Sequence, residues 1–199
     1  MLLHSGAQTE VFFHGFRAFW PIGAQILQKR PLDPTDVRIL AALQAHGRMS
    51  SIELGEAVHL SASQCHRRMK RLEEDGVIAA YTAVLDPEAV GLGLLAFIAV
   101  TLARHGGEPA RRFEDAVRRL PEVLECHSIS GEADYLLRVV APDLKAFSDF
   151  MMNDLVAIPG VASVRSNIAL QPVKRGGALP LAHLAGGAAR TAPAKRGPR

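Results

Sequence analysis

The 199-residue sequence predicts an α+β protein built from two unlike domains. Three observations support this fold class. Residues 32–76 contain three short segments that each open with a helix-capping residue, which is typical of a helical domain. From residue 94 onward, apolar segments alternate with amphipathic ones, as in a domain of mixed strands and helices. Residues 86–93, with one proline and two glycines, break both patterns and predict a linker.

The first two helices are expected on either side of Gly47. Asp33 is a natural N-cap for the first helix, and Pro34 after it suits the first helical position. Ser50 and Glu53 have the spacing of a capping box at the start of the second helix. Both segments carry apolar side chains at helical spacing, so we expect them to pack against each other.

A third helix follows after a very short connection. It opens with Ser61 and Gln64, which have the spacing of another capping box, and closes at Gly76. Three short helices with tight connections predict a helix-turn-helix. Residues 77–85, VIAAYTAVL, tolerate strands and are expected to form a short ribbon. Residues 32–85 are therefore predicted to form a winged helix-turn-helix domain.

The second domain is predicted over residues 94–175 as a ferredoxin-like βαββαβ unit. Its expected strands are LLAFIAVTLAR, VLECHSIS, YLLRVVA and VASVRSNIALQPV. Its expected helices are EPARRFEDAVRRL, with Phe113, Val117 and Leu120 inward, and DLKAFSDFMMNDLVAI, with Leu144, Phe147, Met151 and Leu155 inward. Two helices cover one face of such a sheet, so we expect a second copy of the chain to cover the other.

Both ends of the chain are expected to be poorly ordered. Residues 1–31 form an extension that gathers Phe12, Phe13, Phe16, Phe19 and Trp20, and we favour loose order there over a packing or partner-binding role. Residues 176–199 are predicted to be a flexible basic tail. Six cations and no acids follow Pro172, and without these six the formal charge of +3 becomes about −3. The pI near 9.1 therefore says little by itself about nucleic-acid binding.

Composition narrows the class of protein. Hydrophobic residues make up 48% of the chain and charged residues 22%, as in globular proteins. No uninterrupted apolar run reaches roughly eighteen residues, so a membrane-spanning helix is not expected. The two cysteines are flanked by polar residues and predict no disulfide framework, which fits the reducing cytoplasm.

The stretch SASQCHRRMKRLEEDG at residues 61–76 at first suggests a Cys-His site for a metal or a thiol enzyme. On a helix, Cys65 shares an apolar stripe with Met69 and Leu72, whereas His66 points about 100° away. Neighbouring strand residues also point to opposite faces, so the Cys126-His127 dipeptide is no better placed. No CxxC or HxxxH spacing occurs, and we expect no metal, cofactor or catalytic site.

The opposite face of this helix carries cations, which predicts a nucleic-acid-binding surface. The alternative is that these cations simply form an exposed, solvated surface that binds nothing. The helix is the second of a helix-turn-helix, however, which is the one that enters the DNA major groove. Its three acids gather at the far end, away from the cations. The side chains predicted to reach double-stranded DNA are Ser61, Ser63, Gln64, His66, Arg67, Arg68, Lys70 and Arg71.

At this point the sequence resembles a known family. The segment LDPTDVRILAALQAHGRMSSIELGEAVHLSASQCHRRMKRLEEDGVIAAYTAVLDPEAVG is similar to the DNA-binding half of the Lrp/AsnC (feast/famine) transcriptional regulators. ECHSISGEADYLLRVVAPDL and IPGVASVRSNIAL are similar to their amino-acid-sensing domain, and the resemblance covers about Leu32 to Leu181. The family usually has glycine where this chain has His59, and a positive φ there costs a non-glycine residue roughly 1 kcal/mol. Gln64 stands where the family often has proline.

The resemblance also implies an effector site. In the family, a turn with a G-x-x-D-Y pattern lies at a dimer–dimer interface that binds a small-molecule effector, usually an amino acid. The effector-binding residues expected here are Ser128, Ser130, Gly131, Asp134 and Tyr135. Turn N–H groups and a serine can hold a carboxylate, and a carboxylate such as that of Asp134 can pair with an ammonium group. The alternative is a plain hairpin turn.

We therefore expect a cytoplasmic transcriptional regulator that binds DNA as a homodimer and responds to an amino acid. The resemblance implies back-to-back sheets in the dimer and association of dimers into tetramers or octamers. Two alternatives stay open: an amino-acid-binding module without a regulatory role on DNA, and a thiol or metal enzyme. The basic tail either adds salt-dependent DNA affinity or only aids solubility.

Overall fold

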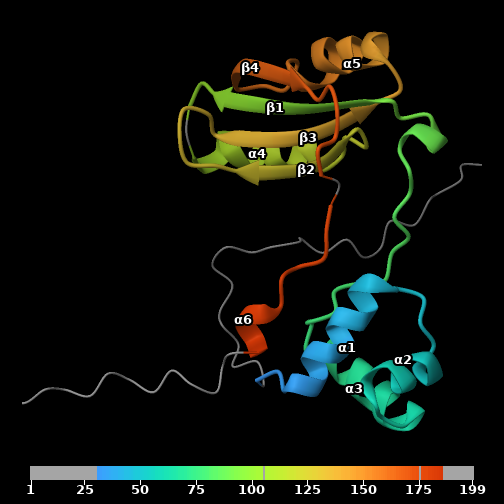
Figure 1. The fold of residues 1–199 in the computed structure, drawn as a ribbon. Helices are drawn as coiled ribbons and strands as arrows, with labels where there is room; N and C mark the ends of the chain where they lie inside the picture. Colours follow the sequence, from blue (N-terminus) through green and yellow to red (C-terminus); the bar gives the residue numbers. More distant parts are fainter. Residues whose placement is uncertain (1–30, 105, 175, 186–199) are drawn as a thin grey trace, which may run out of the picture. The chain divides into compact units, whose positions relative to one another are not determined.

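The computed structural model describes residues 31–104, 106–174 and 176–185. These residues divide into two compact units (Figure 1). The first unit runs to Ala80 and takes in the chain again from Pro180, and the second spans Tyr81–Leu179. The aromatic cluster at the start of the chain lies outside the described residues.

The first unit is built on three helices: α1 (Pro34–Ala45), α2 (Ser51–Val58) and α3 (Ala62–Glu74). Their N-caps are Asp33, Ser50 and Ser61, and each forms a complete capping box. The boxes expected at α2 and α3 are confirmed, and α1 has one in addition, with Asp36 as the returning side chain. The helices enclose a small core whose buried apolar members are Ile39, Leu54, Val58, Cys65 and Leu72.

A left-handed residue makes the turn between α2 and α3. His59 has φ 59° and ψ 50°, and it is the one non-glycine residue with positive φ in the described part of the chain. The turn is tight because Leu60 N–H donates to the Gly55 carbonyl at 2.9 Å. A Cβ on Gly55 would lie 2.6 Å from the Leu60 carbonyl oxygen, so only glycine fits there.

The ribbon expected after α3 does not form within this chain. Between α3 and the first strand, at Leu94, the described residues contain one short 3-10 turn, Glu88–Val90, and no strand. An isolated extended segment has no neighbour to accept its backbone hydrogen bonds, which explains why a strand-like composition alone was misleading. Val84 and Leu85 are 95% and 65% exposed.

The second unit is a four-stranded antiparallel sheet with helices on one face. Its elements are β1 (Leu94–Leu102), α4 (Gly107–Val117), β2 (Val123–Ser128), β3 (Tyr135–Ala141), α5 (Leu144–Phe150) and β4 (Val161–Ile168). The strand order β2-β3-β1-β4 confirms the βαββαβ prediction (Figure 1). Alternate residues of β1 and β3 pack with Phe113, Val117 and Phe147 from the helices.

The second helix of this unit differs from the prediction at its start and its end. Leu144, expected to face inward, is 62% exposed because it is the first helical residue, and Phe147 and Phe150 are buried. The helix then continues as one π-helical turn, Met151–Leu155, in which Leu155 is fully buried. The wider turn keeps Leu155 over the core.

The other face of the sheet carries a mixture of apolar and charged side chains. Phe97 on β1 is 39% exposed. Arg138 on β3 and Glu125 on β2 form an ion pair at 2.6 Å. The sheet is therefore covered on one face only within the unit.

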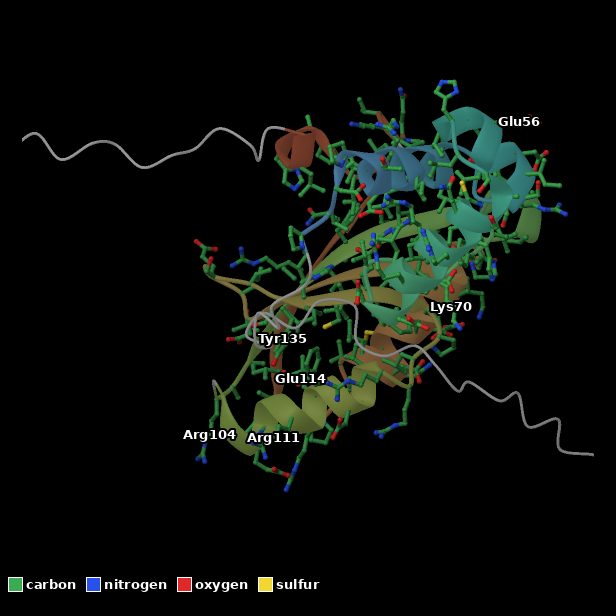
Figure 2. The ribbon with its side chains drawn as sticks, turned by 90° about the horizontal axis from the view of Figure 1, so that it is seen from below. Glu56, Lys70, Arg104, Arg111, Glu114 and Tyr135 are labelled. Atoms are coloured by element: carbon green, nitrogen blue, oxygen red, sulfur yellow. The ribbon has the colours of Figure 1, made fainter. Side chains whose placement is uncertain are left out.

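The C-terminal residues depart from the expected flexible tail. Ala182–Ala185 form a one-turn helix, α6, which packs against α1 in the first unit (Figures 1 and 2). Residues 186–199 lie outside the described part.

Replacing His59 by glycine is expected to raise the unfolding free energy of the first unit by about 1 kcal/mol. Glycine adopts a positive φ without the Cβ clash that histidine suffers there. Urea unfolding followed by circular dichroism measures the change. His46→Gly is the matched control: His46 is the C-cap of α1, but its φ is −140°, so glycine should stabilise nothing. Equal effects at the two positions would contradict the strain at His59.

Candidate nucleic-acid interface and effector turn

Helix α3 separates its cysteine from its histidine, as predicted. Cys65 is fully buried in the core of the first unit, and His66 is exposed. Burial raises the pKa of the Cys65 thiol, although the nearby Arg68 opposes this. In the second unit Cys126 packs against the core, where burial raises its pKa to about 11, while His127 lies 3.4 Å from Glu125 on the exposed side. Neither dipeptide forms a joint site.

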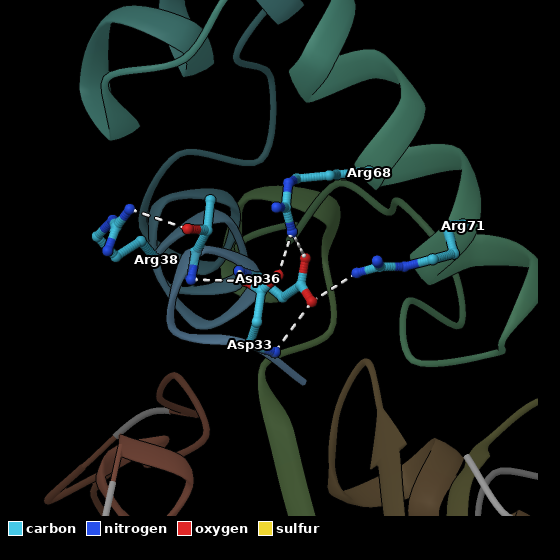
Figure 3. Close-up of polar contacts among 6 residues, drawn as sticks. Asp33, Asp36, Arg38, Arg68 and Arg71 are labelled. Carbon is cyan, nitrogen blue, oxygen red and sulfur yellow. Dashed lines mark hydrogen bonds and ion pairs between the residues drawn. The ribbon is translucent and has the colours of Figure 1, made fainter. Parts of the chain in front are cut away.

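A buried carboxylate links α1 to α3. Asp36 is 1% exposed, and its oxygens lie 2.7 Å from Arg68 and 2.5 Å from Arg71 (Figure 3). Asp33 adds a second contact to Arg68 at 2.6 Å, and its backbone N–H donates to Asp36 at 3.1 Å. Two arginines and one backbone donor thus satisfy a charge that would be strongly destabilising if it were buried alone.

The same network sets the protonation of Asp33. Burial alone would raise the pKa of this carboxyl, but hydrogen bonds from Arg68 and from the N–H groups of Asp36 and Thr35, together with the positive charge of Arg68, lower it below the ordinary value of 3.8. Asp33 is therefore held as a carboxylate beside Arg68.

The structure thus divides the predicted DNA-facing set. Arg68 and Arg71 turn toward α1, and their side chains are only 25% and 29% exposed. The sequence had placed both arginines among the side chains predicted to reach DNA. The acids that turn both arginines inward lie at α1 and its N-cap, 32 residues or more before Arg68. The one sign of this contact in the sequence is that Asp36 lies on the apolar stripe of α1, three residues before Ile39.

The remaining side chains of the set lie on the open face of α3. Ser63, His66, Arg67 and Lys70 are exposed, and Lys70 makes a loose contact with Glu74 at 3.8 Å. Ser61 and Gln64 are exposed but serve the helix cap: Ser61 N–H donates to the Gln64 side-chain oxygen at 3.0 Å. The amide NH₂ of Gln64 is a donor group that the cap leaves unused.

The predicted effector turn joins β2 to β3 and is also divided. Ser128, Ser130 and Gly131 are exposed, and Gly131 has φ 136°, a conformation open in practice to glycine. Glu132 beside them reaches Arg165 of β4 at 3.3 Å. These residues present hydroxyl and backbone groups to solvent.

Asp134 and Tyr135 are built into the fold. The Asp134 carboxylate accepts the Leu102 N–H at 2.7 Å, and its backbone bonds to Val100 and Ile129. Tyr135 is 6% exposed and points to α4, where its hydroxyl donates to Glu114 at 3.0 Å (Figure 2). Burial and this carboxylate raise the pKa of Tyr135 to about 12. Nothing in the local sequence identifies Glu114, which lies 21 residues earlier.

No helix in the described residues is long and apolar enough to cross a membrane. Within the same residues, no three His, Cys, Asp or Glu side chains gather as a metal site.

The two units match two known domain families. Residues 32–79 match a winged helix-turn-helix DNA-binding family, and residues 95–179 match the Lrp/AsnC ligand binding domain. The chain is 40% identical over 151 residues to the leucine-responsive regulatory protein of Escherichia coli K12, covering 74% of this chain and 92% of that one. The chain belongs to the Lrp/AsnC family.

Solved structures agree with this assignment. A transcriptional regulator from Neisseria meningitidis, solved as an L-Met complex, is 44% identical with a TM-score of 0.74, over 77% of this chain and 99% of that one. An AsnC family regulator from Agrobacterium tumefaciens is 37% identical with a TM-score of 0.72, over 76% and 99% of the two chains. The protein is thus an Lrp/AsnC transcriptional regulator with a helix-turn-helix DNA-binding domain and a ligand-binding domain.

Replacing Asp36 by asparagine should lower the unfolding free energy of the DNA-binding domain of this Lrp/AsnC regulator by about 2 kcal/mol. The change leaves two arginines without their shared counter-ion, and their partial exposure limits the loss. Thermal or urea unfolding measures it. Glu56→Gln on the exposed side of α2 is the control and should leave stability unchanged. Equal stabilities of the two variants would contradict a structural role for Asp36.

Proposed function

We propose that this regulator binds double-stranded DNA through the exposed face of α3, and that an amino acid bound at the β2–β3 turn controls the binding. The observation that carries the DNA assignment is the division of the α3 cations. Arg68 and Arg71 are held by α1, so Arg67 and Lys70 remain exposed on the second helix of the helix-turn-helix.

Each polar residue of α3 then has a defined role. Arg67 and Lys70 contact phosphates or guanines, and Ser63, Gln64 and His66 meet base edges or phosphates near the start of the helix. Ser61 caps the helix. Arg68 and Arg71 orient α3, and their remaining N–H groups can still donate to a nearby phosphate. In a dimer, two such helices would read half-sites spaced about one helical turn apart, or a multiple of it.

The effector assignment rests on the exposed turn and on the relatives. Ser128, Ser130 and the backbone N–H groups around Gly131 offer donors for a carboxylate. Asp134 supplies negative charge toward an ammonium group, and Tyr135 supports the turn from inside. One relative is solved with L-Met and another is named leucine-responsive, which favours an amino acid as the effector here.

Assembly completes the proposal. The sheet face that the helices leave uncovered would pair with that of a second copy, and dimers would associate into tetramers or octamers. Such a protein acts on cytoplasmic DNA without catalysis, metal or cofactor. An amino-acid-binding module with no role on DNA is the competing function, and the first experiment below separates the two.

Charge reversal at Arg67 and Lys70 together, each to glutamate, should weaken operator binding by roughly 100-fold without unfolding the protein. The two cations face the DNA, so glutamates there would repel phosphates. Fluorescence anisotropy with a labelled operator fragment measures the loss. Arg104→Glu with Arg111→Glu is the control, because these exposed arginines of the ligand-binding domain give the same charge change (Figure 2). Equal losses in both variants would overturn the assignment to α3.

A thermal-shift screen of the twenty amino acids should identify at least one that stabilises the protein. A ligand at 100 times its Kd adds roughly 2.7 kcal/mol to the folded state. The variant Ser128→Ala with Ser130→Ala should lose this shift, whereas Ser148→Ala, an exposed serine on α5, should keep it. A full shift in the double variant would place the effector elsewhere.

A further inference from the structure

The C-terminal segment that begins at Pro180 lies beyond both family matches. The ligand binding domain match ends at residue 179, and α6 follows at Ala182–Ala185. This short helix belongs to the DNA-binding unit and packs against α1 (Figures 1 and 2). The chain therefore passes between the two units twice, once at Ala80–Tyr81 and again at Leu179–Pro180.

A helix of one turn does not form on its own. Helices shorter than about 12 residues are marginal in water, because the first turn fixes several residues for a single hydrogen bond. In α6 that bond runs from Leu184 N–H to the Leu181 carbonyl at 3.0 Å. Leu181 and Leu184 are half-buried, whereas Ala182 and His183 are exposed. The packing against α1 thus supplies the stabilisation that the turn lacks.

The helix that receives this segment is the one that orients α3. Asp33 and Asp36 of α1 hold Arg68 and Arg71. We propose that residues 180–185 are a docking element that attaches the end of the ligand-binding domain to α1 through Leu181 and Leu184, and that its docking steadies α3. The consequence for DNA rests on the proposed function, whereas the docking itself does not.

Hydrogen exchange followed by mass spectrometry tests the docking on the full chain without DNA or effector. Leu181→Asp with Leu184→Asp should speed exchange in the peptides of α6, α1 and α3 by a factor of roughly 5 to 30. Ala182→Asp with His183→Asp is the matched control, since it adds similar charge to the exposed side of the same turn. Equal exchange in the two variants would overturn the proposal.

Truncation provides a second comparison that does not depend on added charge. Chains ending at Ala185 and at Leu179 both lack residues 186–199, but only the second also lacks the docking element. The chain ending at Ala185 should keep the slow exchange of α1, and the chain ending at Leu179 should lose it. Equal protection of α1 in the two chains would refute docking.

DNA binding reports on the coupling to α3. The Leu181→Asp with Leu184→Asp variant should bind an operator more weakly than the control variant by a factor of about 5. Equal affinities would overturn the steadying of α3. If the unaltered chain itself binds no DNA, the proposed function fails, and the exchange of α1 and α3 still decides whether the segment docks and steadies them.

Discussion

The DNA-binding domain depends on a single buried carboxylate. Asp36 is almost wholly inaccessible, and a charge in that position is tolerated only because Arg68, Arg71 and the Asp33 backbone N–H meet its oxygens. The same contacts tie α3 to α1 at a defined rotation. These contacts occupy two of the four Arg and Lys side chains of α3. The rotation of α3 therefore also decides which cations face outward. In the proposed function, stability and DNA recognition are therefore coupled through one residue.

In the ligand-binding domain, buried side chains position exposed ones in a comparable way. Asp134 and Tyr135 belong to the turn by sequence, yet one holds the β1 backbone and the other reaches Glu114 on α4. Ser128 and Ser130 stay exposed at the edge of this anchored turn. In the proposed function, a ligand that shifts the turn also has to shift contacts to β1 and α4, which gives the effector a physical route into the rest of the domain.

Local signals in the sequence were sufficient for much of this structure. Capping boxes at Ser50 and Ser61, the inward Cys65 and the order of strands and helices all follow from spacing, and the strain at His59 was expected from the glycine that the related proteins have there. Most of what the sequence did not predict depends on contacts between residues far apart along the chain. A ribbon at residues 77–85 needs a neighbouring strand that composition cannot supply, and the partners of Arg68 and Tyr135 come from other helices. Burial of Asp36 could have been suspected, because an acid on an apolar stripe needs a cation opposite it.

Helix α1 makes contacts with both α3 and α6. It carries the acids that orient α3, and it receives α6 from the far end of the chain. Coupling free energies between sites are typically about 1–3 kcal/mol. Exchanging one contact of the Asp36 network for a solvated arrangement has a free energy of similar size. In the proposed function, a modest displacement of α1 would therefore alter how α3 presents Arg67 and Lys70. In the proposed function, control of DNA binding then requires no large rearrangement of either domain, only a change in what holds α1.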